Sequence, residues 1–316
     1  MKSDFFVYFN TDFGEDPGRR RPGDEIRVNK EFEFAGRHFV IPSLWSCAGG
    51  IVVDVIMKVD ASAFFAYKKK WGKWVPAPTS DPDSVDPDRS YEAYSTNPAS
   101  FEYDAVLYVN GRTLDSAFCC GISYMPIVDS PYDAELTDSI IRHYGLPRGA
   151  GFMLIRHHFA WKRRVKEIRA LEIELTELPF AKQGPEFTAE SAGQAFRFTD
   201  GIAGIERELR VIDLHQMNNE LRDVEDRARI VGVNTVVTLI YKLEPELESG
   251  DIRLRCRVGG KDASGTTGGP YKEGTLEPLN EYRIASSAPF RGSTGKVSWK
   301  MELYPPARVK TVRLIP

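Results

Sequence analysis

The feature that most constrains the fold is the dense spacing of turn residues between short segments of alternating apolar and polar residues. Such alternation is typical of a strand with one buried face. The segment 106–109 runs into Asn110-Gly111 and then into a second segment, 112–114. An Asn-Gly pair in this position predicts a tight hairpin, because both turn residues need a positive φ. Many short strands separated by turns favour antiparallel sheets over a parallel sheet with crossover helices.

Similar segments continue along the whole chain, and few helices are indicated. We predict further strands at 5–9, 32–34, 39–41, 51–57, 152–161, 171–175, 196–198, 209–214, 236–241 and 252–258. Asp60 and Gly72 fit the two ends of a helix over 61–71, whose basic last turn suits the negative end of the helix dipole. A second helix is predicted over 131–144, and a third, more polar one over 217–228. The predicted class is therefore all-β (mainly β) with inserted helices.

The length of 316 residues suggests two domains, since a domain typically holds about 150 residues. We predict two tandem β-sandwich-like domains, 1–178 and 186–316. The first would carry a proline-rich excursion at 75–100 and the helix over 131–144. The segment 177–185 contains two prolines and a glycine, which favour a linker between the domains.

A short internal similarity also favours two related halves. The residues 164–169 (Arg-Val-Lys-Glu-Ile-Arg) and 308–313 (Arg-Val-Lys-Thr-Val-Arg) share four of six residues. Each segment follows a Trp-Lys pair, at 161–162 and at 299–300. Because each segment falls at the end of a predicted domain, we interpret the pair as the closing strands of a tandem repeat.

Charge and hydropathy exclude several classes of protein. The formal net charge of −3 argues against nucleic-acid binding by bulk charge, because such domains usually carry a strong basic excess. The most apolar stretch, 49–57, is too short for a membrane span and contains Asp54. Residues 1–10 lack the continuous apolar run of a secretory signal. We therefore expect a cytoplasmic protein without a membrane segment.

The opening of the chain resembles a known group of sequences. The resemblance is carried by Tyr8-Phe9-Asn10-Thr11-Asp12-Phe13-Gly14-Glu15-Asp16-Pro17-Gly18 and by Arg21-Pro22-Gly23-Asp24-Glu25. This pattern is similar to the start of a family of uncharacterised bacterial proteins of similar length, and the similarity extends to Gly145-Leu146 and to the strand near Trp161. The resemblance implies a bacterial, cytoplasmic protein and implies no activity, ligand or site.

Cysteine and histidine spacing does not predict a metal centre or a cofactor. The four cysteines include the adjacent pair Cys119-Cys120, but they form no C-x-x-C motif. We expect reduced, buried thiols. His157 and His158 are neighbours on a predicted strand, where successive side chains point to opposite faces. They should therefore not bind one ion together.

Two segments resemble catalytic or phosphate-binding motifs only in part. Gly121 to Met125 has the start of a nucleophile elbow, but methionine occupies the place of the second glycine. The glycine-rich residues 259–270 end in proline, whereas a phosphate-binding loop continues into a helix. We interpret both as ordinary parts of a β protein.

Aromatic and basic residues supply the candidate binding site. Trp45 could stack against the apolar face of a sugar. The segment that begins at Trp161 presents basic residues that suit an anionic ligand. The candidate binding residues are Trp45, Trp161, Arg163, Arg164 and Lys166.

We favour a non-catalytic binding or assembly protein, because no local cluster joins a nucleophile to a base or a metal. Exposed strand edges would favour self-association or pairing with a protein partner. The sequence does not define a small-molecule ligand. The alternative is a hydrolase acting on a carbohydrate or a similar polar substrate. It would use paired carboxylates about 5 to 10 Å apart, drawn from Asp54, Asp104 and Asp115.

Overall fold

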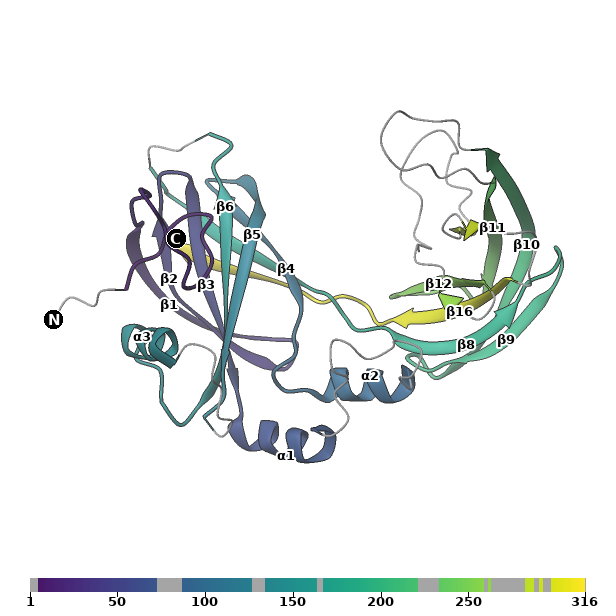
Figure 1. Cartoon of the computed structure of the whole chain (residues 1–316), viewed down its shortest axis with the longest axis horizontal. Helices are drawn as coiled ribbons and strands as arrows, with labels where there is room; N and C mark the ends of the chain where they lie inside the picture. The colour runs from purple at the N-terminus through teal and green to yellow at the C-terminus, as the bar shows by residue number, and fades with distance from the viewer. Residues whose placement is uncertain are drawn as a thin grey trace. The chain divides into compact units, whose positions relative to one another are not determined.

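A computed structural model of the chain describes residues 5–72, 87–126, 134–163, 167–220, 233–258, 261–262, 282–286, 290–291 and 297–315 (Figure 1). The described part is mostly β with antiparallel sheets, as predicted, and it contains three helices. The chain divides into two compact units. The first comprises Met1–Val75, Ser95–Leu178 and Ala307–Pro316, and the second comprises Pro76–Tyr94 and Pro179–Pro306.

One eight-stranded antiparallel sheet forms the first unit. Its strands, in spatial order, are β1 (Asp24–Phe34), β2 (Arg37–Ser46), β3 (Gly50–Val59), β6 (Gly151–Ala160), β5 (Arg112–Tyr124), β4 (Tyr103–Val109), β7 (Leu171–Glu177) and β17 (Val309–Ile315). The two outermost strands, β1 and β17, approach each other, so the sheet curls back on itself. The sheet therefore has an inner face that encloses the main core and an outer face that other segments cover. The predicted pair of tandem sandwiches is not confirmed.

Tight turns connect neighbouring strands where the sequence predicts them. Asn110 and Gly111 have φ values of 50° and 77° and join β4 to β5. Ala35 and Gly36, with φ values of 50° and 74°, join β1 to β2 in the same way. Two consecutive positive φ values are characteristic of the hairpin turn that matches the twist of the strands. The predicted hairpin at Asn110-Gly111 is confirmed.

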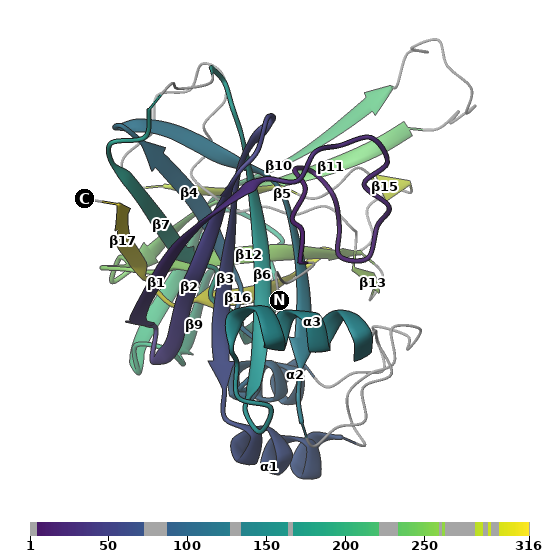
Figure 2. The same cartoon turned by 90° about the vertical axis from the view of Figure 1, so that its left-hand side faces the viewer.

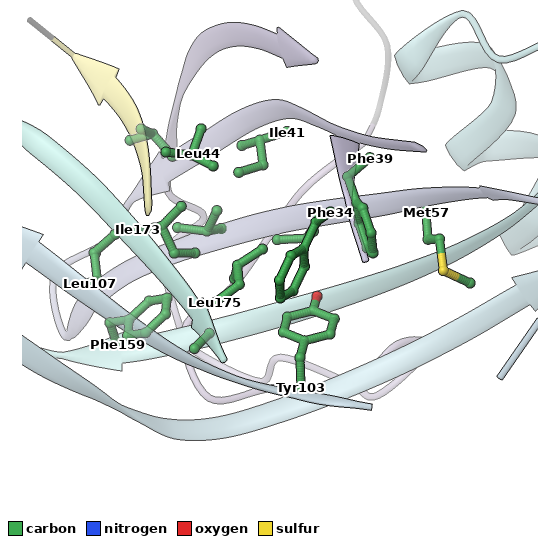
Figure 3. Packing of buried hydrophobic residues seen from close by; sticks show 14 of the residues in the cluster. Phe34, Phe39, Ile41, Leu44, Met57, Tyr103, Leu107, Phe159, Ile173 and Leu175 are labelled. Carbon is green, nitrogen blue, oxygen red and sulfur yellow. The ribbon is translucent and has the colours of Figure 1, made fainter. Parts of the chain in front are cut away.

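Large apolar side chains from the strands of the first unit meet on the inner face of its sheet (Figure 3). Phe39, Leu107, Phe159 and Ile173 are almost completely buried there. Nearly every residue of β3 is buried, including those whose side chains point outward. A strand that is covered on both faces has apolar side chains at consecutive positions. This explains why residues 50–57 are almost entirely apolar.

Two of the three predicted helices are present in the structure. Helix α1 (Ala61–Trp71) is confirmed, and the Asp60 side chain caps it by accepting from the amide of Ser62 at 2.8 Å. Helix α3 (Ala134–Tyr144) confirms the second predicted helix from residue 134 onward, while 131–133 lie outside the described residues.

The third predicted helix and the proline-rich excursion differ from expectation. The helix predicted over 217–228 is wrong at its start, because 217–220 belong to strand β10 (Ile205–Glu220) and pair with β11 (Val233–Glu244). Residues 221–232 lie outside the described part. Within the predicted excursion, helix α2 (Pro87–Thr96) forms, with its proline at the first helical position. Proline is tolerated there because the first amides of a helix have no partner within it.

The second unit contains two sheets with a shared core. One contains β14 (Arg283–Ser286), β11, β10 and β9 (Ala195–Asp200), with β15 (Phe290–Arg291) also on β11. The other contains β13 (Lys261–Asp262), β12 (Asp251–Val258), β16 (Val297–Tyr304) and β8 (Lys182–Thr188). Leu209 and Leu239 from the first sheet belong to the same buried cluster as Leu254 and Trp299 from the second.

The division of the chain differs from the predicted 1–178 and 186–316. The first unit does end at Leu178 along this stretch, but residues 307–316 return to it. Strand β17, which contains most of the second repeated segment, pairs with β7 of the first unit. The strand therefore does not close the second half of the chain. The predicted linker is also shorter than expected, because β8 begins at Lys182.

Among the described residues, no helix is long and apolar enough to cross a membrane.

Candidate functional site

The outer face of the first unit's sheet is covered by α3 and by the N-terminal residues that precede β1. Figure 2 shows α3 lying across this face. Ile140 and Ile141 of α3 pack against Ile56 of β3 and Leu154 of β6. The segment before β1 is held in place as well, because Val7 is completely buried in a cluster with Trp45 and Val52. Polar side chains between these layers are therefore withdrawn from solvent.

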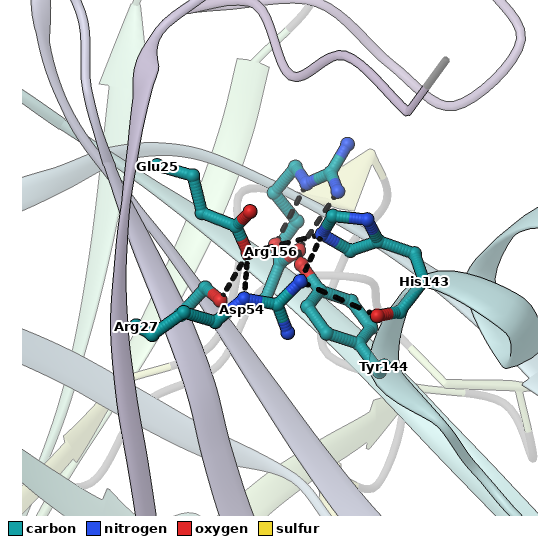
Figure 4. Close-up of polar contacts among 7 residues, drawn as sticks. Glu25, Arg27, Asp54, His143, Tyr144 and Arg156 are labelled. Carbon is teal, nitrogen blue, oxygen red and sulfur yellow. Dashed lines mark hydrogen bonds and ion pairs between the residues drawn. The ribbon is translucent and has the colours of Figure 1, made fainter. Parts of the chain in front are cut away.

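A buried ion pair lies at the centre of this face. Asp54 of β3 and Arg156 of β6 are directly opposite each other on adjacent strands. Arg156 Nε and Nη2 donate to the two carboxylate oxygens of Asp54 at 2.7 and 2.8 Å. The Tyr144 hydroxyl of α3 also donates to Asp54 Oδ2 (Figure 4). The side chains of Asp54 and Arg156 are only 0% and 6% exposed.

The pairing sets the charge state of this cluster. Burial disfavours the charged guanidinium, but the carboxylate of Asp54 outweighs burial and raises the pKa of Arg156. Burial and the same carboxylate raise the pKa of Tyr144 well above its ordinary value. Tyr144 therefore remains a hydrogen-bond donor at neutral pH. A carboxylate held by three donors is a fixed structural anion, with little capacity left to accept a proton from a substrate.

A second polar cluster joins β1 to the end of α3. Glu25 Oε1 accepts from Ser43 Oγ at 2.5 Å and lies 2.8 Å from Arg27 Nε. His143 Nε2 lies 3.0 Å from the same oxygen, and the Phe5 ring stacks on the imidazole with centroids 4.3 Å apart. Burial lowers the pKa of His143 in spite of Glu25. These contacts fix α3 and the N-terminal residues to the sheet.

His158 and Cys120 lie beside Arg156 and resemble a catalytic cysteine and its base. The amide of Asn10 donates to His158 Nδ1 at 3.0 Å, so the proton of the neutral ring is on Nε2, 4.0 Å from Cys120 Sγ. Nε2 therefore cannot accept the proton of the thiol. Burial also raises the pKa of Cys120 to about 12. The arrangement is unsuited to a cysteine nucleophile.

A pocket of about 170 Å³ opens next to Arg156, between α3 and the N-terminal residues. Among the described residues of its lining, Arg156 is the one cation, and Asp12 and Glu15 contribute carboxylates. Leu136 and Ser139 of α3 form one side. The aromatic lining residues are Phe5, Phe6, Tyr8 and Phe13. The pocket therefore combines charged groups with ring faces, as sites for small polar molecules do.

The structure does not bring the predicted binding residues together. Trp45 is buried on the outer face, whereas Trp161 packs against the core on the inner side. The indole of Trp161 donates to the carbonyl of Cys47 at 3.3 Å. Arg163 is exposed, and Arg164 and Lys166 lie outside the described residues.

The three carboxylates of the hydrolase alternative also occupy separate environments. Asp54 is buried against Arg156, as described above. Asp104 is exposed on β4. Asp115 is exposed on β5 and lies 3.3 Å from Lys162.

Adjacent cysteines and histidines follow the alternation of their strands. His157 faces inward, with Nε2 3.1 Å from the Tyr103 hydroxyl, whereas His158 faces outward, which confirms the prediction that they point apart. All four cysteines are free; Cys120 is buried, but Cys119 is exposed, so the prediction of a buried pair is wrong for Cys119. Within the part of the chain that the structure describes, no three His, Cys, Asp or Glu side chains are grouped to hold a metal ion.

No family model, curated protein or solved structure matches the chain.

Because His157 and His158 are buried, we predict that the free energy of unfolding of the first unit decreases at acidic pH. Burial lowers the pKa of His157 and of His158 to about 4, below the ordinary value of about 6.5 that applies to the unfolded chain. Between these pH values the unfolded state binds protons that the folded state does not, so the free energy of unfolding decreases from pH 6.5 towards pH 4. We expect the urea midpoint of the first unit to be lower at pH 4.5 than at pH 7.

A comparison of variants isolates the contribution of His158. His158→Gln should show a smaller change in midpoint between the two pH values than the original chain. The control is His38→Gln, because His38 is exposed on β2. Equal changes for His158→Gln and the original chain would contradict the assignment of the pH dependence to His158, whose charged neighbours are Arg156, Asp54 and Asp12.

Proposed function

We propose that the chain is a non-catalytic binding protein whose first unit holds a small polar molecule in the pocket beside Arg156. The observation that carries the proposal is the position of Arg156. Its guanidinium is almost completely buried, yet it lines the pocket. Asp54 engages Nε and Nη2, while Nη1 makes no hydrogen bond to any residue that the structure describes. A preorganised donor next to a cavity is suited to orienting a ligand.

The hydrogen bonds that Asp54 and His158 already make support ligand binding over hydrolysis as the function of this site. A general base needs a free lone pair and access to the substrate. Asp54 has little of either, because Arg156 and Tyr144 occupy three of its about four lone-pair sites and it is fully buried. His158 uses Nδ1 to accept from the backbone.

A variant that fills the pocket tests the proposal. Ser139 lines the pocket from α3, and its hydroxyl contacts only the carbonyl of Leu136 among the described residues. Ser139→Phe should place a ring in the cavity and abolish binding. A thermal-shift screen with amines, amino acids, organic acids and sugars would first identify a ligand. At a hundred times its Kd, a ligand stabilises the native state by about 2.7 kcal/mol, which raises the melting temperature by a few degrees.

The control for this experiment is Arg142→Ala, because Arg142 is exposed on the same helix and does not line the pocket. The ligand should raise the melting temperature of Arg142→Ala as it does for the original chain, but not that of Ser139→Phe. An equal shift in both variants would place the ligand elsewhere, and a screen without any shift would contradict the proposal.

A further inference from the structure

The guanidinium of Arg156 keeps one nitrogen free to donate into the pocket. Asp54 engages Nε and Nη2, and in Figure 4 the third nitrogen points away from that carboxylate. The buried polar atoms that lack a partner in the described part are Nε1 of Trp45 and Trp299, Nδ1 of His157 and Oε1 of Gln183. Arg156 Nη1 is not one of them although it has no hydrogen-bond partner there, so it reaches the open space of the pocket that Arg156 lines. A ligand must therefore offer an oxygen that accepts from Nη1.

Ser139 supplies the opposite half of a hydrogen-bonding pair. Its hydroxyl donates to the carbonyl of Leu136 at 2.6 Å, so the proton of the hydroxyl is already used. A hydroxyl oxygen retains two lone pairs, and no described residue donates to Ser139 Oγ. Ser139 and Arg156 line the same pocket of about 170 Å³. A small ligand that meets both therefore needs an acceptor and a donor close together.

The charges around the pocket favour an uncharged ligand. The positive charge of Arg156 is compensated by Asp54, so the ion pair as a whole attracts no ion. Asp12 and Glu15 also line the pocket, and their carboxylates disfavour an anion. Both are exposed to solvent, and Asp12 is in addition a hydrogen-bond partner of the Cys120 thiol, so they do not form a site for a cation. A neutral group that combines an acceptor with a donor fits these conditions.

Aromatic rings provide the apolar contacts of the pocket. The guanidinium carbon of Arg156 lies 4.4 Å from the centroid of Phe13, so this ring is close to the free donor. Phe6 is 55% exposed and makes no ring contact with a described residue, although it lines the pocket. A large exposed ring of this kind is suited to contact with an apolar group of a ligand.

We infer that the ligand of this pocket is a small uncharged amide with an apolar substituent. The carbonyl oxygen of the amide accepts from Arg156 Nη1, its N–H group donates to Ser139 Oγ, and the substituent contacts the ring of Phe6. An amide carries the acceptor and the donor on the same carbon and has no charge. This inference rests on the proposed function and specifies its ligand class.

Four probes that share a propyl group and differ at the polar end test the ligand class. Butyramide has both the carbonyl oxygen and the N–H group, and 2-pentanone has a methyl group in place of the amide nitrogen. Butyrate is anionic and n-butylamine is cationic at neutral pH. Ligand-observed NMR titration of the full chain would measure the affinities, and the probes join the thermal-shift screen. We expect butyramide to bind about fivefold or more tightly than each other probe, because each of them lacks the acceptor or the donor of one hydrogen bond.

Two serine variants assign the preference to the pocket. Ser139→Ala should weaken binding of butyramide about fivefold and leave that of 2-pentanone unchanged, because only the amide has an N–H group for Ser139 Oγ. Ser116→Ala is the matched control, because the Ser116 hydroxyl also donates to a backbone carbonyl but Ser116 does not line the pocket. It should leave both affinities unchanged.

A double variant removes the donor without leaving a buried charge unpaired. Asp54→Leu combined with Arg156→Met replaces both members of the ion pair, and its urea midpoint would confirm that the first unit is folded. The folded double variant should bind neither butyramide nor 2-pentanone. If it does not fold, the effect of Ser139→Ala on butyramide and on 2-pentanone decides.

The possible failures are distinguishable. Tighter binding of butyrate or n-butylamine than of butyramide, if Ser139→Phe abolishes it, would overturn the amide inference and leave the proposed function intact. Equal affinities of butyramide and 2-pentanone, or equal effects of Ser139→Ala on both, would also overturn the inference. Binding of butyramide that persists in the folded double variant would overturn it as well, because Nη1 would then not be the donor. Absence of binding by all four probes, together with a screen in which Ser139→Phe affects no ligand, would overturn both proposals.

Discussion

Asp54→Ala is expected to lower the free energy of unfolding of the first unit by about 3 to 5 kcal/mol, the usual result of removing one partner of a buried ion pair. The variant would leave the guanidinium of Arg156 buried without its counter-charge. It would also remove the acceptor of the Tyr144 hydroxyl. Urea unfolding followed by tryptophan fluorescence would measure the loss.

Two further variants separate the loss of the ion pair from a general effect of substitution on this face. Asp54→Leu combined with Arg156→Met removes both charges, so it should be more stable than Asp54→Ala alone. Asp115→Ala removes an ion pair whose two side chains are more than two-thirds exposed, and it should cost less than about 1 kcal/mol. A cost of less than about 1 kcal/mol for Asp54→Ala would show that the Asp54–Arg156 pair does not hold this face together.

Most of the strands and the tight turns could be predicted because their signals are local, although residues 5–9 do not form the strand predicted there. Asn110-Gly111 determines its turn through the φ values of two neighbouring residues. Likewise, Asp60 caps α1 through contacts with residues two and three positions away. In both places a few adjacent residues decide the conformation.

The candidate site could not be assembled in the same way. Asp54 is conspicuous in the sequence as the only charge in the apolar stretch 49–57, and a lone buried charge implies a partner. Its partner, Arg156, is 102 residues away and becomes adjacent only through the register of β3 and β6. A shift of that register by one residue would turn one of the side chains to the other face. The pocket depends in addition on how α3 and the residues before β1 lie on the sheet.

The helix predicted over 217–228 is wrong at residues 217–220 for a related reason. Its polar residues fit a solvated helix as well as they fit a strand, so composition does not decide between them. Pairing with β11 decides the conformation of 217–220, and this partner is separated from them in the sequence by residues 221–232. Tertiary pairing overrides weak local preference in such segments.

The division into units depends on a strand pairing that spans a longer stretch of sequence than that of β3 and β6. The tandem prediction assigned the last residues to the second half of the chain because they follow it in sequence. Strand β17 instead pairs with β7, from Val309 opposite Thr176 to Ile315 opposite Leu171. A sheet that curls back on itself can take its closing strand from any part of the chain, and sequence order does not reveal which.

Removal of residues 307–316 is therefore expected to destabilise the first unit and to leave the second unit unchanged. The shortened chain would lose the strand next to β7 and the buried side chain of Val312. The loss of this burial and of the strand pairing should lower the free energy of unfolding of the first unit by about 3 kcal/mol or more. Urea unfolding followed by NMR methyl signals would report the two units separately. A lower midpoint for the second unit alone would instead support the tandem division.

Two valines of β17 provide a finer test of the same point. Val312 is 4% exposed in the core of the first unit, whereas Val309 is 58% exposed on the same strand. Val312→Ala removes two buried methyl groups and should cost the first unit about 2 kcal/mol. Val309→Ala should cost less than about 0.5 kcal/mol, because surface substitutions away from special features usually have small effects. Because the two substitutions are chemically identical, a larger effect of Val312→Ala on the first unit's midpoint would indicate that β17 is buried against that unit's core. Equal costs would show that the strand does not close this sheet.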